Sequence, residues 1–244
     1  MVDSIPGNSS VSEGPLRPLR HARAVIVTSV IVIVLVVIVG LIVAHSSGWT
    51  SHELTVLQWL SAHHTAALSA VALGIAWLFS PPIASIITLL GGVAVLAVTR
   101  SIPRAVTFWV MVGISYLGSE VIKQLVRRAR PDSSTFANPL ADEHSFSFPS
   151  GHTCFAAALG IAIIFLASDH RVRRVIAISA VSVAVVVVAW SRLYLGVHYP
   201  TDVLASMVYT LAASALVLAL WLGFLLPWLR TAAGSARLRR KGTV

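Results

Sequence analysis

A short basic stretch ending in proline is the first feature of the sequence that could do chemistry. Residues 123–131 read Lys-Gln-Leu-Val-Arg-Arg-Ala-Arg-Pro. If they continue a helix, Lys123 and Arg130 share one face, because seven residues make about two turns. Cations held together repel unless an anion binds between them, and guanidinium groups suit phosphate because they can form two parallel hydrogen bonds with it. The stretch therefore predicts a phosphate site, with Pro131 ending the helix.

A second segment could add an anion site and a titratable ring. The sequence Pro-Ser-Gly-His at residues 149–152 comes directly before an apolar run. Ser150 or Gly151 suits the N-cap of a helix, and Gly151 lets the backbone approach a ligand closely. The free N–H groups and the dipole at a helix start attract an anion. His152 would then stand at the rim of that site.

A third segment, residues 191–202, could supply a nucleophile. Arg192 adds a cation, and His198 and Asp202 are four residues apart, so one helical turn can bring them together. A carboxylate bound to one imidazole nitrogen fixes the tautomer and leaves the other nitrogen as a nucleophile or base. Pro200 suits a helix start.

The three segments together hold the parts that phosphoryl transfer requires. Charge on the phosphoryl oxygens must be neutralised, a nucleophile must attack in line, and an acid must protonate the leaving oxygen. The sequence has no Walker-type Gly-x-x-x-x-Gly-Lys, and near these segments it has no cluster of carboxylates or histidines at metal-ligand spacing. We therefore expect the protein's own cations to take the place of a metal ion.

The order and spacing of the segments resemble the three signature motifs of the type 2 phosphatidic acid phosphatase (PAP2) family, within the vanadium haloperoxidase-like superfamily. The resemblance covers about residues 50–226. It implies a six-span helical core and a phosphatase without metal or cofactor that acts on lipid phosphates and diphosphates. It implies that His198 attacks phosphorus, that Asp202 orients His198 and that His152 protonates the leaving oxygen. It also assigns phosphate binding to Lys123, Arg130, Ser150, Gly151 and Arg192.

Composition indicates what must position these residues. The 244 residues are 57% hydrophobic and only 11% charged, and the mean hydropathy is +0.85. These values exclude an ordinary soluble domain and a disordered chain, and they favour an all-α integral membrane protein. Residues 66–79 are apolar but short, and we expect an interfacial or re-entrant helical segment there, with a seventh crossing as the alternative that the sequence leaves open. Six longer apolar stretches predict six transmembrane helices, at residues 24–44, 82–99, 104–122, 152–168, 174–191 and 202–226.

The distribution of Lys and Arg predicts the orientation. With six spans and a cytoplasmic N-terminus, most of the 18 basic residues flank the cytoplasmic ends, as the positive-inside rule requires. Both termini are then cytoplasmic, and the three motifs face the extracytoplasmic side of what we expect to be a bacterial cell membrane. The net charge of +9 is explained by anionic lipid headgroups, so no nucleic-acid partner is expected. Residues 1–23 are predicted to be a disordered tail, 24–228 the phosphatase domain and 229–244 a basic tail.

The remaining polar residues have simpler interpretations. We expect Arg127 and Arg128 to extend toward lipid headgroups. Asp142, Glu143 and His144 are expected to form a solvated loop.

The predicted function is hydrolysis of a lipid phosphate or diphosphate at the outer leaflet, through a phosphohistidine. Polyprenyl diphosphate, phosphatidic acid and phosphatidylglycerol phosphate are the substrates considered. Two alternatives stay open on the sequence. One is a phosphotransferase on the same fold, because water and an alcohol would need the same intermediate. The other is a lipid-phosphate binder or transporter without catalysis. The lipid, the number of phosphates and the oligomeric state are not predicted.

Overall fold

A computed structural model describes residues 21–166 and 171–229 of the chain. The tails predicted at 1–23 and 229–244 lie almost entirely outside these residues. The described residues contain helices and connecting segments, which confirms the predicted all-α class for this part of the chain. The α-helices are α1 (Ala22–His45), α2 (Ser47–Ala62), α3 (Ala66–Leu78), α4 (Pro81–Thr99), α5 (Ile102–Val126), α6 (Gly151–Leu166), α7 (Arg171–Tyr194) and α8 (Pro200–Leu220). Two short helices complete the fold, the 3₁₀-helix η1 (Ser133–Thr135) and the π-helix η2 (Trp221–Leu225).

Within the described residues, five helices are long and apolar enough to cross a bilayer: α1, α4, α5, α7 and the continuous helix Pro200–Leu229 that begins as α8. Val and Ile dominate α1, and the chain is helical there because only a helix satisfies its own backbone in lipid. The prediction of a multi-pass membrane protein is therefore supported. The predicted span at 152–168 corresponds to α6, which the structure describes from Gly151 to Leu166; residues 167 and 168 lie outside the described residues.

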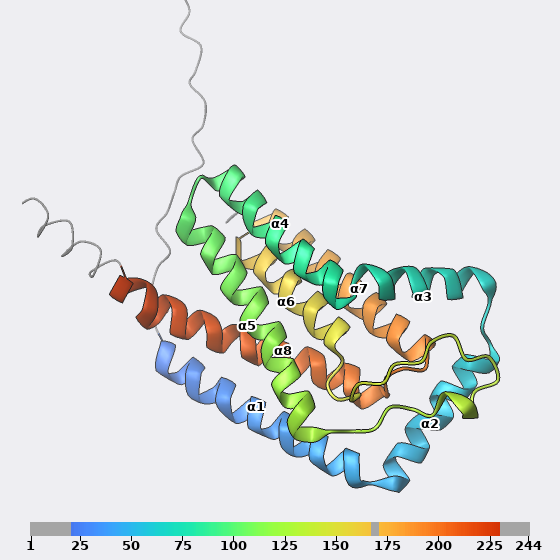
Figure 1. The fold of residues 1–244 in the computed structure, drawn as a ribbon. Coiled ribbons are helices and arrows are strands. Elements are labelled where there is room, and N and C mark those ends of the chain that lie inside the picture. The colour runs from blue at the N-terminus through green and yellow to red at the C-terminus, as the bar shows by residue number, and fades with distance from the viewer. Residues whose placement is uncertain (1–20, 167–170, 230–244) are drawn as a thin grey trace, which may run out of the picture.

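Helix α8 lies at the centre of the bundle and packs against α1, α5 and α6 (Figure 1). In the most apolar part of the helix that starts at Pro200, 56% of the residues are buried inside the protein. In the corresponding parts of α4 and α7, only 11% are buried. The outer helices therefore turn most of their apolar side chains away from the protein, as lipid-facing helices do. Helix α6 fills the space between α5, α7 and α8.

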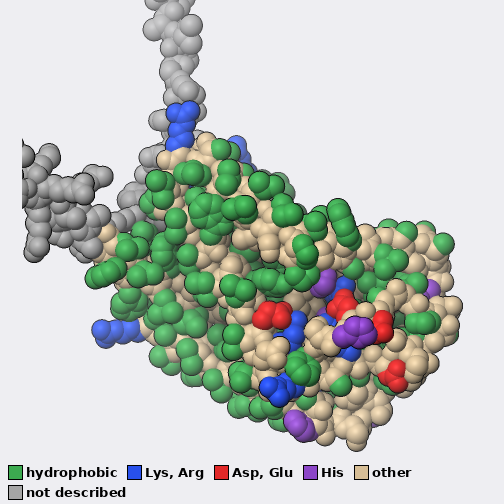
Figure 2. Space-filling view, viewed as in Figure 1, with side chains coloured by type: hydrophobic (Ala, Val, Ile, Leu, Met, Phe, Trp, Pro, Cys, Tyr) green, Lys and Arg blue, Asp and Glu red, His purple; other side chains and the backbone are tan. Residues whose placement is uncertain are grey.

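The polar end of the molecule is built by α2, α3 and the long connection between α5 and α6 (Figure 1). The first residues of α1 and the last of η2 lie at the opposite end. Charged and histidine side chains gather over the α2 end on the face shown in Figure 2, while hydrophobic side chains cover most of the rest. The catalytic candidates therefore belong to one end of the bundle.

Helix α2 is not among the sequence predictions, because its composition is too polar for an apolar stretch. Its buried residues are Glu53, Leu57 and Ser61, spaced four apart on one face. Leu57 packs with Phe136 and Tyr199. The helix is thus an amphipathic cover over the polar end. Helix α3 has 13 residues, a length that fits the predicted short segment at 66–79.

Two glycines allow close approaches that shape the polar end. A Cβ at Gly40 of α1 would lie 2.5 Å from the Phe148 ring, so only glycine lets this ring pack against α1. Gly196 has φ +71°, the left-handed region that glycine adopts without strain, and it turns the chain between α7 and His198. The contact at Gly40 and the turn at Gly196 both hold motif segments in place.

Candidate active site

The chain brings the three motifs together by a route that differs from the sequence prediction. Helix α5 ends at Val126, and Arg127 adopts a left-handed φ of 51°. The prediction that the helix runs on to Pro131 is therefore wrong, and Lys123 and Arg130 do not share a helix face. Lys123 stays in the last turn of α5, while Arg130 lies in the irregular segment that follows.

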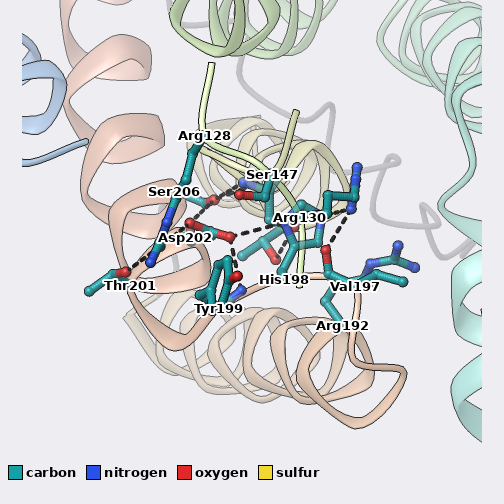
Figure 3. A network of polar contacts seen from close by, with 12 residues as sticks. Arg128, Arg130, Ser147, Arg192, Val197, His198, Tyr199, Thr201, Asp202 and Ser206 are labelled. Carbon is teal, nitrogen blue, oxygen red and sulfur yellow. Dashed lines mark hydrogen bonds and ion pairs between the residues drawn. The ribbon is translucent and has the colours of Figure 1, made fainter. Parts of the chain in front are cut away.

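Arg130 contacts the candidate nucleophile directly (Figure 3). Its Nη1 donates to the carbonyl oxygen of Val197 at 2.7 Å and lies 3.2 Å from Nε2 of His198. Its Nε and Nη2 donate to Ser145. A guanidinium can only donate, so Nε2 of His198 is the accepting nitrogen with a lone pair. The proton of the neutral ring then belongs on Nδ1.

Asp202 lies on the Nδ1 side of His198. Its Oδ2 is 3.6 Å from Nδ1 and accepts the backbone N–H of Tyr199 at 2.9 Å. The distance to the imidazole is too long for a hydrogen bond, and Nδ1 has no hydrogen-bond partner within the described part of the chain. The carboxylate therefore acts on the ring through its charge in this structure.

The environment of His198 favours the neutral ring. The side chain is buried, and burial lowers the pKa of His198 well below its ordinary value. Arg130 and Arg192 lower this pKa further because they repel a positive imidazole, whereas Glu143 opposes them. A neutral imidazole with a lone pair on Nε2 is the form that can attack phosphorus.

Arg192, at the end of α7, is fully buried and incompletely paired. Its Nη2 contacts Oε1 of Glu143, but its Nε and Nη1 have no hydrogen-bond partner among the residues that the structure describes. Buried donors of this kind are costly unless a ligand satisfies them. Arg192 thus keeps two buried donors that no described residue satisfies.

Glu143 joins the two arginines, and the prediction of a solvated loop at this position is wrong. Its Oε2 lies 2.8 Å from Nη2 of Arg130, while Oε1 contacts Arg192. Burial alone would raise the pKa of Glu143, but Arg192 and Arg130 outweigh it and lower the pKa to about 2. The carboxylate is therefore ionised at every working pH. We call Arg130, Arg192 and Glu143 the open cluster.

The second motif borders this cluster. A Cβ on Gly151 would lie 3.3 Å from Oε1 of Glu120 and 3.5 Å from Nζ of Lys123, so the start of α6 lies beside these two side chains. Lys123 is paired with Glu120 at 2.9 Å. Nε2 of His152 donates to the carbonyl oxygen of Ala76 in α3, and the charge of His152 also acts on Glu143.

Ser150 takes the N-cap position that the sequence predicted for it or for Gly151, because α6 begins at Gly151 and Oγ of Ser150 accepts the N–H of Thr153 at 3.5 Å. Its N–H donates to Oγ of Ser206 at 2.8 Å, and its Oγ accepts from Oγ1 of Thr153. The side chain therefore holds the start of α6 against α8 in this structure. A direct part in binding phosphate stays a prediction for Ser150 and for Gly151.

Arg128 departs most clearly from its sequence interpretation. We expected it to extend toward headgroups, but its side chain is only 2% exposed and binds two carboxylates. Its Nη1 lies 2.7 Å from Oδ1 of Asp202 (Figure 3). Its Nη2 lies 2.6 Å from Oε2 of Glu53. The neighbouring Arg127 is exposed. No local signal in the sequence separates these two arginines.

Comparison with known proteins agrees with this arrangement of motifs. The profile of the PAP2 superfamily matches residues 104–225, which is half of the chain. The chain belongs to the PAP2 superfamily. All three motifs lie inside the matched range, whereas Glu53 and the whole of α2 lie outside it.

Relatives within the PAP2 superfamily match parts of the chain. Phosphatidylglycerophosphatase B of Bacillus subtilis is 42% identical over 97 residues, which cover 38% of this chain and 45% of that protein. The chain thus spans less than half the length of this relative. Decaprenylphosphoryl-5-phosphoribose phosphatase of Mycobacterium tuberculosis is 30% identical over 136 residues, covering 54% of this chain and 68% of that protein.

A solved PAP2 structure shares the fold. The crystal structure of a transmembrane PAP2-type phosphatidylglycerolphosphate phosphatase from Bacillus subtilis aligns with a TM-score of 0.62. The alignment covers 82% of this chain and 94% of that one, at 24% sequence identity. The helical bundle described above is therefore a PAP2 membrane fold.

Proposed function

We propose that this PAP2 protein is a membrane-embedded phosphatase that releases phosphate from a lipid phosphate or diphosphate through a phosphohistidine. The observation that carries the proposal is the geometry around His198 and Arg192. Nε2 of His198 presents its lone pair beside Arg130, and the buried Arg192 has two nitrogens without a partner in the described chain. A phosphoryl group bound to both arginines would bring phosphorus close to Nε2.

The first step forms a covalent intermediate. The phosphoryl oxygens take the place of the Glu143 carboxylate on Arg130 and Arg192, and Lys123 adds a third positive charge. Nε2 of His198 then forms a bond to phosphorus, and the bond from phosphorus to the lipid oxygen breaks. Positive charge develops on the imidazole, and Asp202 on the Nδ1 side stabilises it.

His152 is the candidate acid for the leaving oxygen. Its Nε2–H is held by the carbonyl of Ala76, so Nδ1 of the protonated ring is the nitrogen that gives a proton to the departing alcohol or phosphate. Burial lowers the pKa of His152 to about 4 in the protein without substrate, so the ring takes up this proton from water when the phosphate anion binds beside it. In the second step water attacks the phosphohistidine, His152 takes a proton from that water, and free phosphate leaves. No metal ion or cofactor takes part in this scheme.

The substrate class follows from the surroundings of the site. The site lies at one end of a bundle whose outer helices are apolar, so a substrate with a long alkyl chain can reach it from the bilayer. The two relatives are named as phosphatases of phosphatidylglycerophosphate and of decaprenylphosphoryl-5-phosphoribose. The positive-inside rule favours cytoplasmic termini and a site at the extracytoplasmic surface.

Phosphate release from a panel of lipids tests the proposal. The purified protein in detergent should release phosphate from at least one of phosphatidylglycerol phosphate, phosphatidic acid or a polyprenyl diphosphate. Vanadate should inhibit the release and EDTA should not, and His198→Ala should remove activity while the protein still folds. If water is the acceptor, the oxygen of isotopically labelled water should appear in the released phosphate. Activity that survives in His198→Ala would contradict the mechanism.

A further inference from the structure

Three buried residues and the half-buried Thr201 form a network on the Asp202 side of His198. We call Glu53, Arg128, Thr201 and Asp202 the closed network. The Nη1 of Arg128 donates to Thr201 and Asp202, and its Nη2 donates to Thr50 and Glu53. Both terminal nitrogens of this guanidinium are therefore engaged by the protein, while its Nε has no hydrogen-bond partner among the described residues. Figure 3 shows the side that faces Thr201 and Asp202.

Glu53 closes the network from a different part of the chain. Its Oε1 accepts the N–H of Thr201 at 2.6 Å, and its Oε2 accepts the Thr201 hydroxyl at 3.0 Å. Its side chain is 8% exposed. The carboxylate thus sits at the start of α8, where the helix dipole favours a negative charge, and it binds α2 to the element that carries Asp202.

The charges of the network do not cancel. One guanidinium is shared between two carboxylates, so the group carries one negative charge beside the imidazole. If Arg128 were paired with Asp202 alone, the pair would be neutral. The Arg128 guanidinium also lies over the Tyr199 ring, 4.0 Å from its centre, which fixes its position.

We propose that Glu53 and Arg128 are positioning residues for the phosphoryl transfer at His198. Arg128 holds Asp202 on the Nδ1 side of the ring, and Glu53 draws part of the guanidinium charge away from Asp202. The carboxylate of Asp202 then keeps the negative charge that stabilises the imidazole when Nε2 bonds to phosphorus. This inference rests on the proposed function, and it assigns a role to α2, which lies outside the matched PAP2 range.

The charge that His198 experiences comes from several elements. Besides Asp202 of α8, the charged groups acting on it are Lys123 of α5, Arg130 after α5, Glu143 of the α5–α6 connection and Arg192 of α7. A change in Glu53 alters none of these groups directly. If a substitution of Glu53 shifts the pKa of the His198 imidazole, the shift is therefore transmitted through the closed network.

Glu53→Gln is the informative variant, with Glu53→Asp and Asp132→Asn as controls. The amide can still accept hydrogen bonds, and Arg128 stays paired with Asp202, so no buried charge is left alone. We expect kcat to fall about tenfold with little change in KM, which is about 1.4 kcal/mol. The acid limb of the pH profile should move to lower pH, because loss of a negative charge lowers the pKa of His198.

The controls separate charge from shape. Glu53→Asp keeps the negative charge and should keep the wild-type acid limb. Asp132→Asn removes an exposed carboxylate that bonds to Ser134, and it should change neither kcat nor the pH profile. The proposal would be overturned if Glu53→Gln had wild-type kinetics. It would also be overturned if the acid limb of the pH profile moved as far in Glu53→Asp as in Glu53→Gln.

Two further measurements keep the test decisive. If Glu53→Gln fails to fold, Arg128→Lys retains the charge but cannot bridge both carboxylates, and it should lower kcat without moving the acid limb. If the wild-type protein releases no phosphate from any lipid, the proposed function fails. The inference about charge is then still tested by ¹⁵N NMR titration of His198, whose signal is identified by its loss in His198→Ala. An unchanged titration in Glu53→Gln would overturn it.

Discussion

Arg128 and Arg130 are two residues apart, yet they belong to opposite sides of the candidate nucleophile. Arg130 is part of the open cluster, where it shares the Glu143 carboxylate with an incompletely paired Arg192. Arg128 is part of the closed network, where its terminal nitrogens bind two carboxylates and two hydroxyl groups. Arg192 has two buried nitrogens without a partner among the described residues, Nε and Nη1, whereas Arg128 has one, Nε. The open cluster therefore has more donors left for a ligand, while both terminal nitrogens of Arg128 are used within the protein.

The two carboxylates that contact these arginines also differ. Glu143 comes from an irregular connection, is 31% exposed and can be displaced by a phosphoryl group. Glu53 is buried on a helix and is tied to Thr201 as well as Arg128. The open cluster should therefore control substrate binding and turnover, and the closed network should control stability and the charge on His198.

Arg192→Ala should give the largest effect and should act on activity alone. It removes a buried guanidinium that would hold the phosphoryl oxygens in the transition state. The loss of one such donor costs about 10³-fold in kcat, or about 4 kcal/mol. Phosphate release measures this loss, and thermal unfolding in detergent should stay close to wild type. If Arg192→Ala lowered the unfolding temperature and left turnover normal, the open cluster would serve stability and not catalysis, contrary to the comparison above.

Arg128→Met should act on stability as well as on turnover. It leaves Glu53 and Asp202 buried without a cation, and removing one partner of a buried ion pair costs on the order of 3 kcal/mol in the free energy of unfolding. Denaturant unfolding in detergent measures the loss, with the exposed Arg127→Met as the matched control. If both variants unfold at the same denaturant concentration as the wild-type protein, the closed network has no structural role.

Glu143→Gln should strengthen anion binding. The carboxylate competes with phosphate for Arg130 and Arg192, so its neutral form should bind vanadate or inorganic phosphate about tenfold more tightly, which is about 1.4 kcal/mol. The inhibition constant for vanadate measures the change. Asp142→Asn, which removes the adjacent exposed carboxylate, is the control and should change nothing. Weaker binding in Glu143→Gln would show that Glu143 assists the anion.

The pH dependence should reflect the buried state of His198. Because burial and Arg130 lower its pKa, the ring stays neutral as the pH falls through 6.5, the ordinary histidine value. The acid limb of wild-type kcat/KM should therefore lie below pH 6.5. Arg130→Gln should move the limb upward while reducing activity, and an unchanged limb would exclude Arg130 as a cause. This is the smallest of the expected effects.

The sequence by itself determined the solvent of the protein and the residues of the site. Apolar stretches longer than a bilayer crossing must be helical, because lipid offers the backbone no hydrogen-bond partner. Five of the six predicted stretches correspond to helices of spanning length. The remaining stretch, at 152–168, corresponds to α6, which is described as far as Leu166. Motif spacing identified His198, Asp202, Arg130 and Arg192, which lie together because each is close to a helix end on one side of the bundle.

Only the tertiary structure decided which charges meet. Arg127 and Arg128 are neighbours of the same type, and the left-handed turn at Arg127 directs one outward and the other into the bundle. Glu53 and Arg128 are 75 residues apart, and α2 is too polar to stand out in a hydropathy pattern. Local spacing reports what one helix can present, whereas the pairing of buried charges depends on how separate elements pack.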